Sequence, residues 1–106
     1  MTRELQISKK DADFYDKLMD MTGKQIYDKY GYKRDETFTH TAKFENGFEA
    51  DIKLVICDED EYPYVEAVLF ENGHERACSD GTGDSMLGKW YLPYNGTEYE
   101  VNVKVA

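Results

Sequence analysis

The period of the apolar residues changes partway along the chain, and this change constrains the fold more than any other feature. In the first part, Phe14, Leu18 and Met21 recur at the spacing of one face of a helix. Farther on, apolar side chains occupy every second position through residues 38–44, apart from His40, and through residues 48–56. Such alternation is typical of antiparallel strands with one buried face. The sequence therefore predicts helices followed by an antiparallel sheet.

Two helices are predicted, over residues 9–21 and 23–30. Ser8 is a good N-cap for the first, because its hydroxyl can accept a hydrogen bond from a backbone amide in the first turn. Thr22 and Gln25 have the spacing of a capping box, which favours the start of the second helix immediately after the first.

The turns between the predicted strands set their register. A three-residue loop at 45–47 places Phe44 opposite Phe48 and keeps one face of the hairpin apolar. The tetrapeptide Phe-Glu-Asn-Gly recurs at residues 70–73, and we expect the same turn there. At residues 95–96, Asn-Gly favours a two-residue type I′ turn instead.

A chain of 106 residues is the usual size of one domain. The predicted fold class is α+β: two short N-terminal helices packed on one face of an antiparallel β-meander of about six strands. Residues 1–34 would form the helical head and residues 35–106 the sheet. Loops are expected at residues 58–63 and 80–85.

Charge is distributed unevenly along the chain, whose net charge is −9. Residues 1–34 carry eight basic and six acidic side chains, whereas residues 35–106 carry five basic and sixteen acidic ones. A strongly acidic sheet disfavours direct binding to nucleic acid and favours a basic protein partner.

The sequence has no apolar stretch near the length of about 20 residues that spans a membrane. Its first residues lack the apolar core of a signal peptide, so we expect a cytoplasmic protein. Cys57 and Cys78 lack the spacing of a metal or redox motif and are expected to be thiols, although a disulfide between neighbouring strands stays open.

No arrangement of residues predicts a catalytic centre, a cofactor or a metal site. His40 lies on the apolar side of a predicted strand, where a hydrogen-bonded histidine at the edge of the core is expected, and His74 follows a turn. The four carboxylates of residues 58–61 lack the alternation and the glycine of an EF-hand loop. Residues 80–85 contain two glycines but lack the Gly-Lys-Ser/Thr end of a phosphate loop.

Acidic and tyrosine side chains are the candidates for binding a partner. Glu49 with Asp51, and Glu98 with Glu100, stand two residues apart on outward-facing positions. This spacing is about 6.7 Å along a strand, of the order of the distance between phosphates in nucleic acid. Tyrosines 62, 64, 91 and 94 lie close in sequence to two turns. The predicted partner-binding residues are Glu49, Asp51, Asp58, Glu59, Asp60, Glu61, Tyr62, Tyr64, Tyr94, Glu98 and Glu100.

The runs Phe44–Leu54 and Tyr64–Phe70 resemble in style the small acidic accessory proteins that bacterial phages and mobile elements encode. Anti-CRISPR inhibitors are the best-known functional members of that group. The resemblance implies inhibition of a nucleic-acid-binding bacterial nuclease through occupation of its DNA-binding or guide-binding groove.

Three hypotheses follow. The first is a non-enzymatic inhibitor or regulator that binds a basic, nucleic-acid-binding bacterial protein by imitating the charge of nucleic acid. The second is a structural or assembly protein of a phage or mobile element that associates with itself through a sheet edge. The third, a small enzyme, would require a cleft that gathers His40 or His74 with carboxylates.

Overall fold

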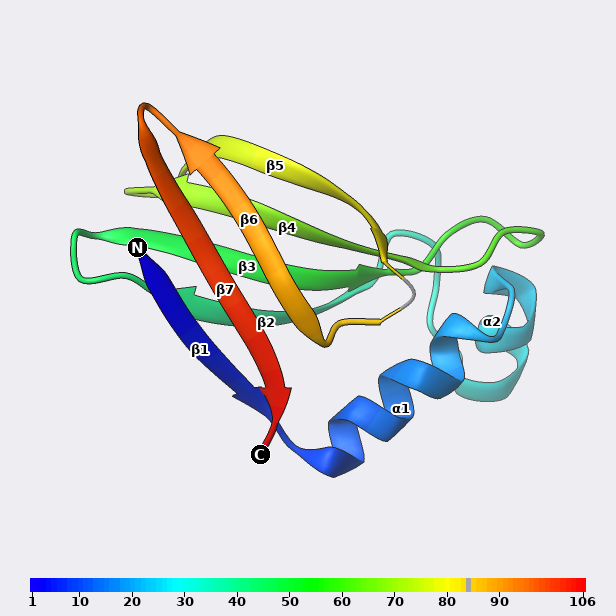
Figure 1. Cartoon of the computed structure of the whole chain (residues 1–106). Coiled ribbons are helices and arrows are strands. Elements are labelled where there is room, and N and C mark those ends of the chain that lie inside the picture. The colour runs from blue at the N-terminus through cyan, green and yellow to red at the C-terminus, as the bar shows by residue number, and fades with distance from the viewer. Residues whose placement is uncertain (84) are drawn as a thin grey trace.

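The computed structural model describes residues 1–83 and 85–106, with the backbone alone at 80–83. Two helices and seven strands follow one another along the chain (Figure 1). In order they are β1 Thr2–Ile7, α1 Lys9–Met19, α2 Gly23–Tyr30, β2 Thr37–Lys43, β3 Phe48–Val55, β4 Tyr64–Glu71, β5 His74–Gly83, β6 Gly88–Tyr94 and β7 Thr97–Val105.

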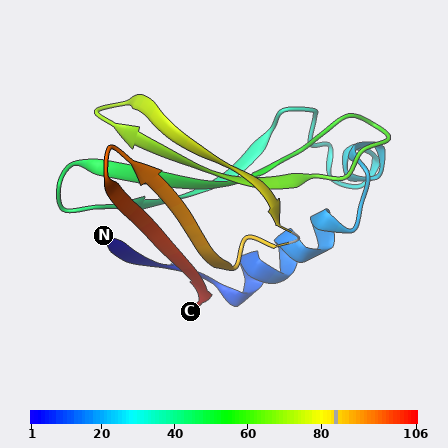
Figure 2. The same ribbon diagram turned by 45° about the horizontal axis from the view of Figure 1, so that its top comes forward.

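The strands form two sheets, which corrects the prediction of a single six-strand meander. One sheet has the order β1-β7-β6 and the other the order β2-β3-β4-β5. The sheets pack face to face with their strands crossed (Figures 1 and 2). At the two sides of this sandwich β1 lies near β2, and β5 lies near β6. The α+β class is confirmed in this coarser form.

Strand β1 was not predicted, so the prediction of a purely helical head is wrong for the first residues. It pairs in parallel with β7, from Thr2 opposite Glu100 to Ile7 opposite Val105. A parallel pair between segments so far apart in sequence has no connecting turn that would reveal it. Only Leu5 and Ile7 show the alternation, which is too short a run to tell a strand from a helix start.

The helices begin where predicted. Ser8 Oγ accepts a hydrogen bond from Asp11 N at 3.1 Å, and Thr22 with Gln25 forms the capping box. The first helix ends at Met19, two residues earlier than predicted, because Thr22 adopts the extended backbone (ψ 163°) of an N-cap and draws the chain away from the helix axis.

The position predicted for the helices, on one face of a single sheet, is wrong. They lie at one end of the sandwich, where α1 runs from the end of β1 toward α2 (Figures 1 and 2). Rings from α1 fasten this end to the four-stranded sheet: Phe14 and Tyr15 both contact Phe38 of β2, at centroid distances of 5.7 and 5.8 Å.

Two of the three turns have the predicted register. His40 lies opposite Ile52 and Ala42 opposite Ala50 around the loop at 45–47, and Tyr94 lies opposite Thr97 around the Asn-Gly turn. The third prediction is wrong.

At the third turn, Glu71 lies opposite His74, so only Asn72 and Gly73 form the loop. Their φ values of 52° and 80° match those of the Asn95-Gly96 turn, 50° and 79°. A register irregularity between Leu69 and Phe70 shifts the pairing of β4 with β5, which makes the tighter type I′ turn fit.

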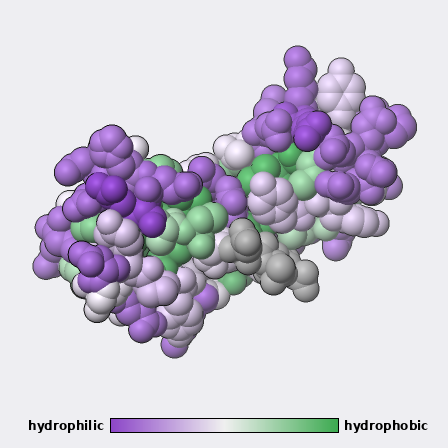
Figure 3. Space-filling model, turned by 90° about the horizontal axis from the view of Figure 1, so that it is seen from above, coloured by the Kyte–Doolittle hydropathy of each residue, from purple (hydrophilic) through white to green (hydrophobic). Residues whose placement is uncertain are grey.

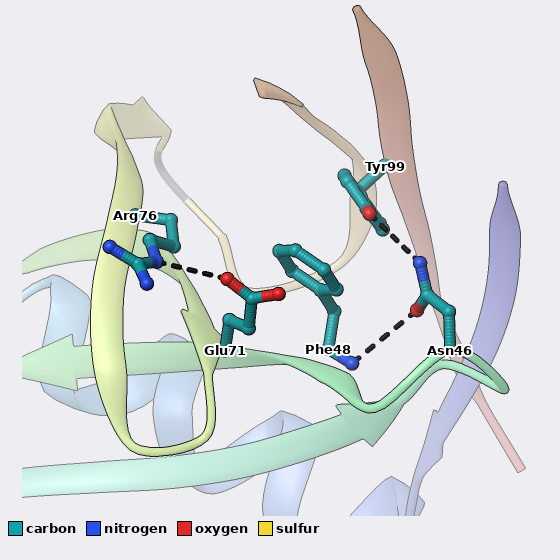
Figure 4. A network of polar contacts seen from close by, with 5 residues as sticks. All are labelled: Asn46, Phe48, Glu71, Arg76 and Tyr99. Atoms are coloured by element: carbon teal, nitrogen blue, oxygen red, sulfur yellow. Dashed lines mark hydrogen bonds and ion pairs between the residues drawn. The ribbon is translucent and has the colours of Figure 1, made fainter. Parts of the chain in front are cut away.

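The turn between β2 and β3 makes polar contacts with the other sheet at the end opposite the helices, where Arg3 Nη2 of β1 lies 3.5 Å from Glu45 Oε1. Asn46, in the turn between β2 and β3, donates from Nδ2 to the hydroxyl of Tyr99 on β7 at 2.9 Å (Figure 4). The Tyr99 ring is buried between Phe44 and Phe48, with centroids 5.1 and 4.7 Å away. The side-chain oxygen of Asn46 accepts from the amide of Phe48 at 3.4 Å.

The predicted loop at 80–85 is partly wrong, because β5 continues through Gly83. Asp84 lies outside the described residues. The whole molecule measures 43 × 27 × 20 Å, and hydrophilic side chains gather at both of its ends (Figure 3).

Candidate protein-binding surface

The outer face of the four-stranded sheet carries one group of predicted residues. Ala50, Ile52 and Leu54 of β3 are fully buried between the sheets, so the alternate positions of the strand point away from the core. The residues of β4 that pair directly with these outward-pointing residues of β3 lie on the same outer face. Its residues on these two strands are Glu49, Asp51, Lys53, Val55, Tyr64, Glu66, Val68 and Phe70.

The loop at 58–61 extends this face at the end that holds the helices. Val55 and Tyr64, which pair at that end of the sheet, line a groove together with Asp58 and Glu61. We call one set of carboxylates the acidic surface. It comprises those of the loop, those of β3 and β4 on the outer sheet face, and Asp35, which lines the same groove: Asp35, Glu49, Asp51, Asp58, Glu59, Asp60, Glu61 and Glu66.

The loop is held by its backbone, which leaves its side chains free to meet solvent. The carbonyl of Glu61 accepts from the amide of Gly23 at 2.9 Å, and that of Glu59 accepts from Lys24 at 3.0 Å. These amides belong to the first turn of α2 and have no partner within the helix. The side chains of Glu59, Asp60 and Glu61 are exposed.

Three of the eight carboxylates on the acidic surface lie within ion-pair distance of a cation among the described residues, and one of these pairs joins Arg34 Nε to Asp35 Oδ2 at 3.9 Å. Arg34 Nη1 lies 3.0 Å from Asp58 Oδ1, and Lys43 Nζ lies 4.0 Å from Glu49 Oε1. Asp51 accepts a hydrogen bond from the hydroxyl of Thr41 at 2.6 Å. In the part of the chain that the structure describes, no cationic group forms an ion pair with Asp51, Glu59, Asp60, Glu61 or Glu66.

This negative charge acts on two neighbouring groups. Burial, together with the charges of Glu61 and Asp58, raises the pKa of the Cys57 thiol above its ordinary value. Burial and the charge of Glu66 raise the pKa of Tyr64 in the same way. Both groups would become anions on losing a proton, and nearby carboxylates oppose that.

Two of the predicted tyrosines stand on or beside the acidic surface and are exposed. Tyr62 exposes 58% of its surface and Tyr64 exposes 42%. Large aromatic side chains surrounded by charges are frequent anchors of protein interfaces.

The remaining predicted residues lie elsewhere. Glu98 and Glu100 alternate along β7 with buried Tyr99 and Val101, so they face outward from the three-stranded sheet, on the opposite side of the sandwich from Glu49 and Asp51. Tyr94 is half-buried against Phe48, beside a turn at the end away from the 58–61 loop (Figures 1 and 2).

Sequence reasoning missed three contributors. Glu66 stands two residues after Tyr64 on the same strand, a signal that was present in the sequence. Asp35 and Arg34 come to the surface only through long-range pairing, because Asp35 N donates to the carbonyl of Ile56 at 2.9 Å. Local spacing gives no sign of that contact.

His40 has the role expected for it. Its Nε2 lies 2.6 Å from the hydroxyl of Tyr15 on α1, partly buried at the edge of the core. Among the described residues, no three His, Cys, Asp or Glu side chains converge as metal ligands would. Cys57 is half-buried and Cys78 is exposed, and both are thiols.

A larger groove, of about 450 Å³, lies on the other side of the loop, against α2. Its lining mixes both signs of charge around two tyrosines: Lys24, Lys33 and Arg34 with Asp28, Asp58 and Glu59. Four of these ions already form pairs, Lys24 with Asp28 at 3.1 Å and Arg34 with Asp58 at 3.0 Å. The groove therefore lacks the excess of negative charge that marks the acidic surface, whose eight carboxylates outnumber the cations beside them, Arg34, Lys43 and Lys53.

No protein-family model, curated protein or solved structure matches this chain. None of the helices in the described part of the chain has the length and apolar character needed to cross a lipid bilayer.

Proposed function

We propose that this chain is a non-catalytic inhibitor or regulator that binds a basic protein surface through its acidic surface. The observation that carries the proposal is the grouping of carboxylates without cationic partners beside exposed Tyr62 and Tyr64, on a loop fixed to α2. An excess of negative charge steers a partner of positive charge, and the tyrosines supply contact area that is buried on binding.

A nucleic-acid-binding protein is the proposed class of partner, because such proteins carry a basic groove that accepts closely spaced negative charges. The resemblance to anti-CRISPR inhibitors suggests a bacterial nuclease within that class, and we propose that the chain binds it in the cytoplasm. Of the two carboxylate pairs proposed to imitate phosphates, Glu49 and Asp51 share the outer face of the four-stranded sheet with Glu66, whereas Glu98 and Glu100 face the other way.

The sandwich offers a matched pair of variants to test this. Glu49→Lys with Asp51→Lys reverses charge on the acidic surface, and Glu98→Lys with Glu100→Lys makes the same change on the opposite sheet. The immobilised chain is incubated with bacterial lysate at low salt, and captured proteins are identified by mass spectrometry. We expect basic nucleic-acid-binding proteins to be retained by the native chain and the second variant, and to be lost with the first.

The captured protein is then purified and tested for binding to DNA or RNA in the presence of the chain. Inhibition that weakens as salt rises supports the proposal. Equal capture by both variants, or capture unchanged between about 50 mM and 200 mM salt, would contradict it.

Self-association through a sheet edge is the alternative, and the fold gives it less support. Because β1 lies near β2 and β5 near β6, the edges of the two sheets lie close to one another rather than alone at the surface. A concentration-dependent oligomer in sedimentation experiments, insensitive to the charge reversals, would favour this alternative.

A further inference from the structure

A small groove lies where the loop at 58–61 meets the outer face of the sheet. Its volume is about 160 Å³. Pockets for drug-sized molecules usually occupy about 300–1,000 Å³, so this one has room for a single long side chain. The lining residues are Arg34, Asp35, Val55, Ile56, Cys57, Asp58, Glu61 and Tyr64.

The groove joins an apolar floor to a charged rim. Val55 and Ile56 are buried, at 7% and 1% exposure, and form part of the lining. Glu61 is exposed and unpaired among the described residues, and the ring of Tyr64 is partly open to solvent. A side chain with an aliphatic stem and a cationic head matches this combination, because the stem covers apolar surface while the head meets carboxylates.

The chain itself places a guanidinium at this rim. Arg34 Nη1 lies 3.0 Å from Asp58 Oδ1, and its Nε lies 3.9 Å from Asp35 Oδ2. The backbone fixes one of these carboxylates, because Asp35 has a φ of 69° and its amide donates to the carbonyl of Ile56 at 2.9 Å. Arg34 lies close to one oxygen of Asp58 and only distantly approaches Asp35, and no ion pair within the described residues engages Glu61, so Glu61 and Asp35 can both meet a second cation.

We propose that the groove binds an arginine side chain of the basic partner; this assignment rests on the proposed function and names its point of anchorage. The arginine stem lies over Val55, the guanidinium meets Glu61 and Asp35, and its plane stacks against Tyr64. Arginine is preferred to lysine, because a planar guanidinium stacks on an aromatic ring and shares carboxylates through several donors.

The test uses small probes and the full chain labelled with ¹⁵N. N-acetyl-arginine amide is titrated while the backbone amide signals are followed by NMR, with the lysine and citrulline analogues as matched probes. Citrulline keeps the shape of arginine and lacks its charge. We expect saturable shifts grouped at Asp35, Cys57, Glu61 and Tyr64, weaker ones with lysine and none with citrulline.

Two variants locate the contact. Glu61→Gln and Tyr64→Leu should each raise the dissociation constant of the arginine probe about threefold to fivefold, the effect of one exposed charge or ring contact. Glu98→Gln, on the opposite sheet, should leave it unchanged. Dispersed amide spectra confirm that each variant is folded.

The proposal is overturned by equal shifts with the arginine and lysine probes, by shifts spread over the whole acidic surface, or by unchanged affinity in Glu61→Gln. Failure here is distinguishable from failure of the proposed function. If the arginine probe fails but charge reversal at Glu49 and Asp51 still abolishes capture of a basic partner, the proposed function stands. Only the assignment of the groove as the anchoring point is then rejected.

Discussion

At Gly23 the loop that carries the acidic side chains lies against the start of α2 so closely that a side chain has no room. A Cβ there would come 2.3 Å from the carbonyl oxygen of Asp58 and 2.5 Å from that of Cys57. Both neighbours are backbone atoms, which cannot turn aside as a flexible side chain would. Glycine at this position thus fixes how near the loop stands to the helix.

Gly23→Ala should therefore destabilise the chain, by about 1–3 kcal/mol, although alanine normally favours a helix. Urea denaturation measures the change. Lys10→Ala, at an exposed position of α1, is the control and should change stability by less than about 0.5 kcal/mol. A stabilised Gly23→Ala chain would show that the loop moves away at little cost.

The thiol of Cys57 reports the charge of the loop. Its raised pKa arises first from burial and then from Glu61 and Asp58, so at pH 8 it holds less thiolate than a free cysteine. In a Cys78→Ser background, Cys57 should react with iodoacetamide more slowly than a cysteine peptide does.

Glu61→Gln removes one charge that opposes the thiolate, which lowers the pKa and should speed the reaction at this pH. Glu98→Gln should leave the rate unchanged, because Glu98 lies on the outer face of the three-stranded sheet, on the other side of the sandwich from the 58–61 loop. The pH profile of the rate separates this effect from altered access, because access scales the rate equally at every pH.

At the scale of elements, local pattern predicted the most. The caps of Ser8 and Thr22 and the registers of two hairpins follow from contacts between residues close in sequence. The same approach failed at the turn of residues 72–73, because its length depends on an irregularity in the pairing of β4 with β5, where β5 has one extra residue that sequence does not reveal. Identical tetrapeptides thus form different turns when their strands pair differently.

The turn at 45–47 also connects the two sheets, because Asn46 donates a hydrogen bond to the hydroxyl of buried Tyr99 on β7. Asn46→Ala should cost about 1–2 kcal/mol, because that hydroxyl loses its partner. Tyr99→Phe removes the hydroxyl itself and should cost less. In a double-mutant cycle by urea denaturation we expect a coupling of about 1 kcal/mol, whereas additive effects would mean that the bond contributes nothing to holding the sheets together.

At the scale of the whole molecule, sequence could not place the candidate site. Alternation showed correctly that Glu49 and Glu98 face outward from their strands. It could not show that they face outward from different sheets, because that depends on which strands pair across the chain. Strand β1 was missed for the same reason, because it is defined by its pairing with β7 at the other end of the chain.

Ile7 measures what β1 contributes, since it is 2% exposed and belongs to the core between the sheets. Ile7→Ala should destabilise the whole chain by about 2–5 kcal/mol in a single transition. Gln6→Ala, exposed on the same strand, should have an effect below about 0.5 kcal/mol. If Ile7→Ala frays β1 alone in hydrogen exchange, β1 is an attachment rather than part of the cooperative unit.

The pairing of β1 with β7 also fixes an order of events during synthesis. Thr2 and its partner Glu100 are 98 residues apart, so β1 is synthesised well before the strand that pairs with it. At roughly 5–20 residues per second, the ribosome leaves β1 without its partner strand for about 5–20 s. Throughout that interval Leu5 and Ile7 are exposed to whatever binds nascent apolar segments, and the three-stranded sheet forms only after translation has passed residue 105.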